Sequence, residues 1–182
     1  MGLSVVPAAP AHLEWDRQAI EAGQYWRLLT GHSVHWSLAH LGWDAVAFVM
    51  LGAGCERLAP RRFLACSLVS AVLIGLGLWQ LRPDLAAYRG LSGVDSALFT
   101  MLAATRLRAG EKAVPILAYL VLFTGKLCFE ALTGSALFVP VQLVGATPVP
   151  LAHLIGGTVG VAFGAAPDSA RRGVSVGQVV GS

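Results

Sequence analysis

Five long apolar stretches constrain this chain more than any other feature. They run over residues 34–54, 63–81, 91–105, 113–132 and 148–165. A helix needs roughly 20 residues to cross the hydrocarbon core of a bilayer. Only 13% of the residues are charged, against about 25% in soluble domains. The sequence therefore predicts an all-α, polytopic membrane helix bundle with five transmembrane helices. The third stretch is short for a straight span, and it can begin below the membrane surface after an irregular loop.

Basic residues cluster in three places: Arg57, Arg61 and Arg62; Arg106, Arg108 and Lys112; Arg171 and Arg172. If five helices alternate across the membrane, all three clusters lie on one side, which the positive-inside rule makes cytoplasmic. We therefore interpret them as topology signals, with the lipid bilayer as a partner and no nucleic acid. The predicted organisation is an outer segment with a short first loop at 1–33, a transmembrane domain at 34–165, and a disordered cytoplasmic tail at 166–182. The tryptophans are expected to form an interfacial belt.

Titratable residues inside apolar stretches are costly and mark function by default. On the expected topology, His35, His40, Ser92 and His153 all lie toward the outer ends of their spans. Three segments that are distant in the sequence thus bring polar chemistry to one depth of the membrane. Lys126 and Glu130, four residues apart, are expected to neutralise each other, and the pattern assigns them no chemistry.

Ser92 stands in the stretch GLSGVDSALF, and His153 begins a segment that continues with Gly156 and Gly160. A serine hydroxyl becomes a good nucleophile when an imidazole within about 3 Å takes its proton. The GxxxG spacing allows the last helix to approach a neighbour closely. If that neighbour carries Ser92, the two side chains form a catalytic dyad. The alternative is a simple hydrogen bond between two helices.

Supporting residues are expected around His40. Asp44 follows it by four residues and shares its helix face, while His35 precedes it by five. One interpretation is an oxyanion site made by His40, the backbone N–H of Ser92 and Asp44, with His35 and Gly90 in support. The alternative is a metal site of His35, His40 and Asp44, which the five-residue spacing disfavours. The scattered cysteines predict no disulfide and no zinc site, and no cofactor is expected.

Taken together, WRLLTGHSVHWSLAH, LGAGCER, GLSG and AHLIGGTVG resemble the rhomboid family of intramembrane serine proteases over roughly residues 25–165. The resemblance matches Trp26 and Arg27 to the first loop, and His35 and His40 to the paired histidines. It makes Ser92 and His153 the catalytic residues. The short loops and WRLLTGHSVHWSLAHLGWDAVAF are most similar to the rhombosortase subfamily. That implies a multi-pass enzyme of the bacterial inner membrane that cleaves Gly-Gly-type C-terminal membrane anchors of exported proteins.

The sequence departs from the rhomboid pattern in three places. Asp44 replaces the oxyanion-hole Asn, so it either donates as a protonated acid or only orients His40. Ser96 replaces a Tyr that stacks on the catalytic histidine, which leaves Asp95 as a group that could orient His153. The family's helix before the Trp-Arg loop is absent, which suggests a truncated or mis-started chain.

Two other classes of protein fit parts of the pattern. A rhomboid-like protein without catalysis would bind transmembrane helices, and it usually loses the serine or the histidine, whereas both stand here. A small transporter built on the intramembrane histidines and acids would work without Ser92. In the protease interpretation, the loop between Leu132 and Pro150 acts as a gate for the substrate.

Overall fold

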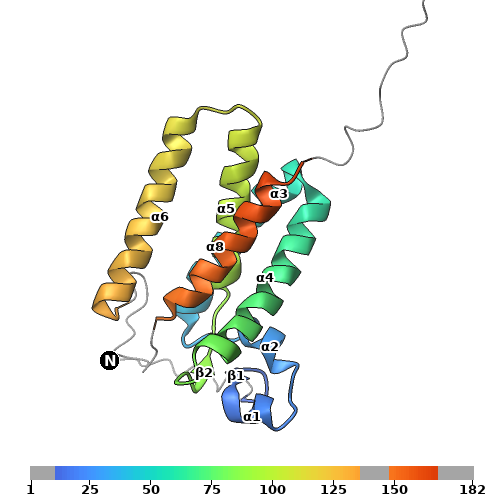
Figure 1. Cartoon of the computed structure of the whole chain (residues 1–182), viewed down its shortest axis with the longest axis vertical. Helices are drawn as coiled ribbons and strands as arrows, with labels where there is room; N and C mark the ends of the chain where they lie inside the picture. The colour runs from blue at the N-terminus through green and yellow to red at the C-terminus, as the bar shows by residue number, and fades with distance from the viewer. Residues whose placement is uncertain (1–10, 136–147, 168–182) are drawn as a thin grey trace, which may run out of the picture.

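The computed structural model describes residues 11–135 and 148–167, and within them it is mostly helical (Figure 1). The elements are β1 (Trp15–Asp16), α1 (Arg17–Glu21), α2 (Arg27–Thr30), the 3-10 turn η1 (Gly31–Ser33), α3 (Leu38–Leu58), α4 (Pro60–Leu81), β2 (Ala87–Tyr88), α5 (Ser92–Arg108), α6 (Ala113–Thr133) and α8 (Pro150–Ala165). Each of the five apolar stretches contains one long helix. The expected gate loop falls largely outside the described residues, as does nearly all of the expected disordered tail.

Local signals in the sequence set the ends of the helices. Ser37 caps α3, because its hydroxyl accepts a hydrogen bond from His40 N at 3.1 Å. Pro60 and Pro150 stand in the first turns of α4 and α8, where a missing N–H costs nothing. The sequence had placed His35 inside the first span. Since α3 begins at Leu38, His35 lies before the helix instead.

The segment before α3 folds into a small cap on one end of the bundle (Figure 1). β1 pairs with β2 in an antiparallel ladder, Trp15 opposite Tyr88. Arg27 is buried, and its guanidinium donates hydrogen bonds to the carbonyl oxygens of Ala11 and Glu14 at 2.6 and 2.9 Å. A buried arginine satisfied by backbone carbonyls fixes a loop, so Arg27 organises the cap.

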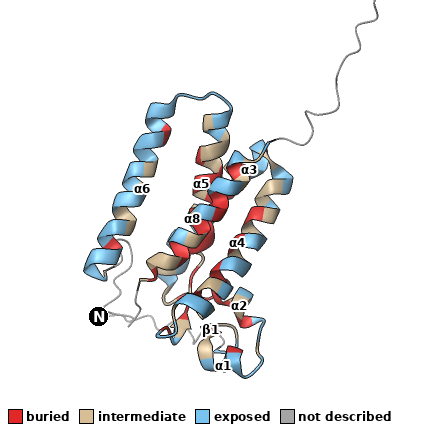
Figure 2. Ribbon diagram, in the orientation of Figure 1, coloured by how far each residue is buried: buried red, intermediate tan, exposed pale blue. Residues whose placement is uncertain are grey.

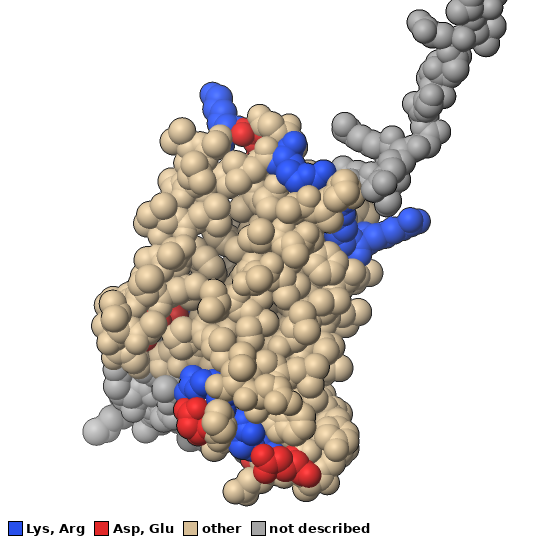
Figure 3. All heavy atoms as spheres, in the orientation of Figure 1, with Lys and Arg blue, Asp and Glu red and all other residues tan. Residues whose placement is uncertain are grey.

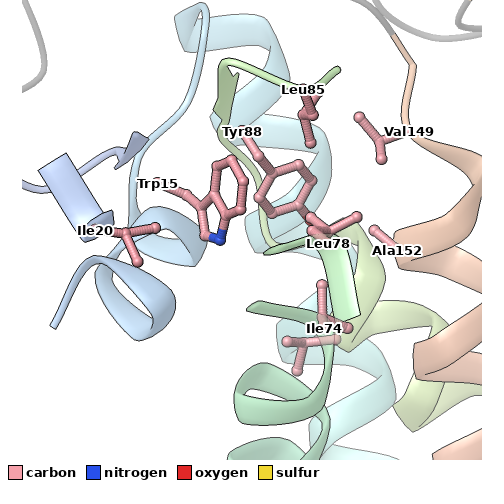
Figure 4. Packing of buried hydrophobic residues seen from close by; sticks show 9 residues of the cluster. Trp15, Ile20, Ile74, Leu78, Leu85, Tyr88, Val149 and Ala152 are labelled. Atoms are coloured by element: carbon pink, nitrogen blue, oxygen red, sulfur yellow. The ribbon is translucent and has the colours of Figure 1, made fainter. Parts of the chain in front are cut away.

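Trp15 anchors this cap to the bundle. Its side chain is fully buried, and its indole N–H donates to Gly75 O of α4 at 3.1 Å. Figure 4 shows it beside Tyr88 in a cluster that continues through Leu78 to Ala152 of α8. The prediction of an interfacial tryptophan belt is therefore wrong for Trp15, because the chain folds back over it.

Helix α5 occupies the centre of the bundle and packs against α3, α4, α6 and α8. More than half of its residues are buried, and Figure 2 shows this buried track along α5 and α8. Ala97, Leu98 and Met101 are almost completely buried, together with Cys55 of α3 and Cys66 of α4. A helix that is surrounded by protein needs no lipid-facing apolar surface, which is why α5 can carry several polar residues.

Three of the helices in the described residues are long and apolar enough to cross a membrane: α3, α4 and α6. Helix α8 is apolar but has 16 residues, and α5 has 17. The count of five transmembrane helices therefore stays a prediction. Side chains such as Val121 and Leu132 on α6 are exposed, and a bilayer would cover them.

Helices α3, α5 and α8 run in the same direction. Near the start of α5, Leu91 contacts Asp44 of α3 and Ser92 contacts His153 of α8, and both partners lie in the first two turns of their helices. At the other end of α5, Arg108 donates to the Gly164 carbonyl of α8. In the face shown in Figure 3, charged side chains gather at the two ends, with a largely uncharged band between them. This distribution suits a bundle whose middle lies in lipid.

Candidate active site

Ser92 and His153 meet between the starts of two helices. Ser92 is the first residue of α5, and His153 lies in the first turn of α8. The distance from Ser92 Oγ to His153 Nε2 is 2.9 Å, a hydrogen bond of ordinary length for these atoms. His153 is buried, whereas Ser92 keeps partial exposure. Nucleophile and base are thus within reach of each other, 61 positions apart in the chain.

Glycines on α8 make this meeting possible. A Cβ added at Gly156 would overlap the carbonyl oxygen of Gly93, and one added at Gly160 would overlap that of Ala97. The two helix backbones therefore touch directly along the GxxxG face, as small residues permit in membrane proteins. The sequence left open which helix the GxxxG segment approaches, and in the structure it is the helix that carries Ser92. Thr100 adds a hydrogen bond from its Oγ1 to the Gly157 carbonyl at 2.8 Å.

A second group gathers at the start of α3. One oxygen of Asp44, Oδ2, lies 3.1 Å from His35 Nε2 and 3.4 Å from His40 Nε2. The two imidazole rings meet edge to face, with centroids 5.0 Å apart. The same Oδ2 accepts a hydrogen bond from Leu91 N at 2.8 Å. Asp44 therefore holds both histidines and the residue just before Ser92.

Gly90 lets the loop reach this cluster. Its φ of +130° is in a region that favours glycine. A Cβ there would lie 3.0 Å from His40 Cε1 and 3.4 Å from Asp44 Oδ2. The six residues assigned from the sequence to catalysis or to the oxyanion site thus belong to one connected set. Contacts join Ser92 to His153, and others join the loop at Gly90 and Leu91 to the group His35, His40 and Asp44.

Two residues that the sequence did not single out also hold this loop. The Tyr88 hydroxyl donates to Gly90 O at 3.0 Å, and the His32 ring nitrogens lie 3.4 Å from Gly90 O and 3.0 Å from Ala71 O. Burial lowers the pKa of His32, more than the two carbonyl contacts raise it. Burial likewise raises the pKa of Tyr88 above its ordinary value of 10.0. No local spacing signals these contacts, because they form only when β2 returns to the cap.

The acid nearest His153 differs from the expected one. Asp95 is buried, yet among the described residues it makes no hydrogen bond or ion pair with His153. Glu130 of α6 does approach it, with Oε2 3.8 Å from His153 Nδ1. The only signal for Glu130 was its place in an apolar stretch, four residues after Lys126.

The metal alternative gains no support from the geometry. In the described part of the chain, no group of three or more His, Cys, Asp or Glu side chains is arranged to hold a metal ion. His35, His40 and Asp44 contact one another instead. A cavity of roughly 760 Å³ lies elsewhere, between α3, α5 and α6, and it is lined by side chains such as Leu102 and Ile116 and by none of the six site residues.

Comparison with known proteins agrees with this arrangement. The Rhomboid domain family matches residues 22–167, most of the chain, so the chain belongs to the rhomboid family. Among its relatives are proteins named "Rhomboid protease GlpG" from Yersinia pestis (strain Pestoides F) and Yersinia pseudotuberculosis serotype O:3 (strain YPIII). Each is 32% identical over 110 residues, which is 60% of this chain and 39% of the relative. The chain thus matches about two-fifths of the length of these relatives. The family predicted from the motifs is confirmed, whereas the rhombosortase subfamily stays a prediction.

Proposed function

We propose that this protein is an intramembrane serine endopeptidase with a dyad of Ser92 and His153. The observation that carries the proposal is the 2.9 Å contact from Ser92 Oγ to His153 Nε2, between helices that the glycines of α8 allow to touch directly. Membership of a family that contains proteases adds support.

The proposed reaction begins when His153 Nε2 takes the proton of Ser92 Oγ and the oxygen attacks the scissile carbonyl carbon. The carbon–nitrogen bond of the tetrahedral intermediate then breaks, and His153 gives its proton to the leaving amine. Water repeats the sequence on the acyl-enzyme and releases the carboxylic acid. A different nucleophile in place of water would make the enzyme a transpeptidase.

The intermediate carries a negative oxygen, and two donors are assigned to it: the backbone N–H of Ser92 and the imidazole of His40. Ser92 N–H stands at the start of α5, where the helix has no internal acceptor for it and the macrodipole favours negative charge. We assign Asp44 an orienting role rather than a donor role. Its Oδ2 already accepts from Leu91 N–H and faces two imidazoles, which suits an ionised carboxylate.

The proposed substrates are exported bacterial proteins with a C-terminal anchor: a Gly-Gly-type site near the outer face, a transmembrane helix and a basic tail. The proposed location is the bacterial inner membrane, crossed several times. A helical substrate must be extended where it meets Ser92, and each glycine in a helix costs about 1 kcal/mol relative to alanine. A Gly-Gly pair therefore lowers the cost of unwinding at the site of cleavage.

Co-expression with reporter proteins tests both the dyad of Ser92 and His153 and the preference for Gly-Gly substrates. One reporter ends in Gly-Gly, an apolar helix and a basic tail, and its matched control replaces Gly-Gly with Leu-Leu. The wild-type chain is expected to cleave the first reporter and spare the second, while Ser92→Ala cleaves neither. Equal cleavage of both reporters by the wild type would refute the Gly-Gly preference. Cleavage that survives Ser92→Ala would refute the dyad and favour a role without Ser92.

A further inference from the structure

An ion pair near the end of α6, with a buried acid and a partly exposed lysine, has no role in the reaction described above. Glu130 is 3% exposed, and its Oε2 lies 2.8 Å from Lys126 Nζ. Most of α6 presents exposed apolar side chains such as Val121 and Leu132. A charged pair within a membrane helix is costly and usually faces the bundle interior for a reason.

The carboxylate also faces the catalytic histidine. Glu130 Oε2 is 3.8 Å from His153 Nδ1, and both side chains are buried. Among the described residues, no group makes a hydrogen bond with Nδ1. For Nε2 to take the proton of Ser92, the proton of the neutral imidazole must be on Nδ1. The nearest carboxylate oxygen to this buried Nδ1 is thus about 1 Å beyond an ordinary hydrogen-bond distance.

We propose that Glu130 is a positioning residue for His153. It selects the tautomer with the proton on Nδ1, and it compensates the positive charge that His153 gains when it takes the proton of Ser92. At 3.8 Å from Nδ1, the carboxylate acts on the imidazole through its charge. This inference rests on the proposed function, since it adds a third, acidic member to the dyad of Ser92 and His153.

Lys126 supplies the competing explanation, in which Glu130 serves only to neutralise that ammonium group. Two variants separate the explanations. Glu130→Gln with Lys126→Met removes both charges, so a neutralising role is no longer needed. The exchange Lys126→Glu with Glu130→Lys keeps an ion pair at the same spacing but directs a cation at His153. Leu132→Ala, on the exposed face of α6, is the matched control for a change in that helix.

The test measures the rate at which a fluorophosphonate probe labels Ser92 in the full chain in detergent. The folded fraction of each variant is isolated first by gel filtration. This rate reports activation of the serine and does not depend on the binding of a transmembrane substrate. We expect Glu130→Gln, the double neutral variant and the charge exchange each to label about 10- to 100-fold more slowly than wild type. Leu132→Ala is expected to label at the wild-type rate. In reporter cleavage, kcat is expected to fall in the three variants while KM stays near that of wild type.

Wild-type labelling in Glu130→Gln would overturn the inference and leave the proposed function standing. Recovery of the wild-type rate in the double neutral variant or in the charge exchange would also overturn it, because only neutralisation would then matter. A wild-type chain that is not labelled at all would overturn the proposed function and, with it, this inference.

Discussion

The direct contact between α5 and α8 gives the sharpest test of how the fold sets the site. We consider Gly156→Ala, one turn after His153. The added methyl group would overlap the carbonyl oxygen of Gly93, next to Ser92. A carbon and a carbonyl oxygen ordinarily stay roughly 3.3 Å apart. The two helices must therefore separate by more than about 1 Å at this level.

That separation of α5 and α8 should lower the free energy of unfolding modestly and the reaction rate strongly. Forced overpacking costs about 1–3 kcal/mol, or a few degrees in Tm for each kcal/mol in a chain of this size. The same shift lengthens the 2.9 Å contact from Ser92 Oγ to His153 Nε2 beyond hydrogen-bond range. A misplacement of about 1 Å at reacting groups costs on the order of 100-fold in rate. Gly156→Ala is thus expected to remain largely folded and to be nearly inactive.

Gly157→Ala is the matched control, one position along the same helix. A Cβ at Gly157 meets only Thr100 Cγ2, at an ordinary 3.7 Å. Replacing a helical glycine by alanine there should raise stability by up to about 1 kcal/mol with activity unchanged. Thermal unfolding in detergent and fluorophosphonate labelling of Ser92 measure the two effects. Equal labelling rates for Gly156→Ala and Gly157→Ala would refute the reasoning.

Three further predictions concern the loop before Ser92. Gly90→Ala places a Cβ 3.0 Å from His40 Cε1 on a backbone whose φ is +130°. Fluorophosphonate labelling of Ser92 should therefore slow, and the Tm should fall by the equivalent of roughly 1–3 kcal/mol in the free energy of unfolding. An unchanged Tm would contradict the expected backbone strain. Asp44→Leu leaves Leu91 N–H without its acceptor, at a cost of about 1–3 kcal/mol in stability, and should nearly abolish cleavage. Asp44→Asn keeps an acceptor oxygen and should retain most of the wild-type cleavage. An equal loss of cleavage in both variants would argue for a charge-specific role of Asp44. Burial lowers the pKa of His32 below its ordinary 6.5, so the unfolded chain takes up that proton first, and the contribution of His32 to stability is complete above about pH 6.5 and declines below it. The Tm of His32→Gln should therefore fall less between pH 7.5 and 5 than that of wild type, and parallel curves would contradict this assignment.

The helices were largely predictable, because length and hydropathy report directly on the bilayer. Their ends were less so. The apolar run suggested a helix from Val34, but Ser37 caps it and begins α3 at Leu38. The cap was not predicted, since the pairing of β1 with β2 joins segments some 70 positions apart and no local pattern encodes that return.

The active site likewise combines residues that the sequence could place with a residue that it could not. Ser92, His153 and the glycines of α8 form motifs at fixed spacing, so their meeting could be inferred from the sequence. Glu130 could not be placed, because its approach to His153 depends on how α6 packs against α8. Asp95 was the more natural candidate by proximity to Ser92 in the sequence. The absence of a hydrogen bond or ion pair between Asp95 and His153 in the described residues illustrates that nearness along a helix does not decide which side chain faces a neighbour.

The most direct test of the central claim is fluorophosphonate labelling of the full chain in detergent, for wild type, Ser92→Ala and His153→Ala, with Thr124→Ser as a control on the exposed side of α6. The account predicts labelling of wild type and the control at the same rate, at a single site identified as Ser92 by mass spectrometry. It predicts no labelling of Ser92→Ala and a loss of several hundred-fold or more, on the order of general-base catalysis, in His153→Ala. Labelling that persists in Ser92→Ala, or a His153→Ala variant as reactive as wild type, would contradict the account.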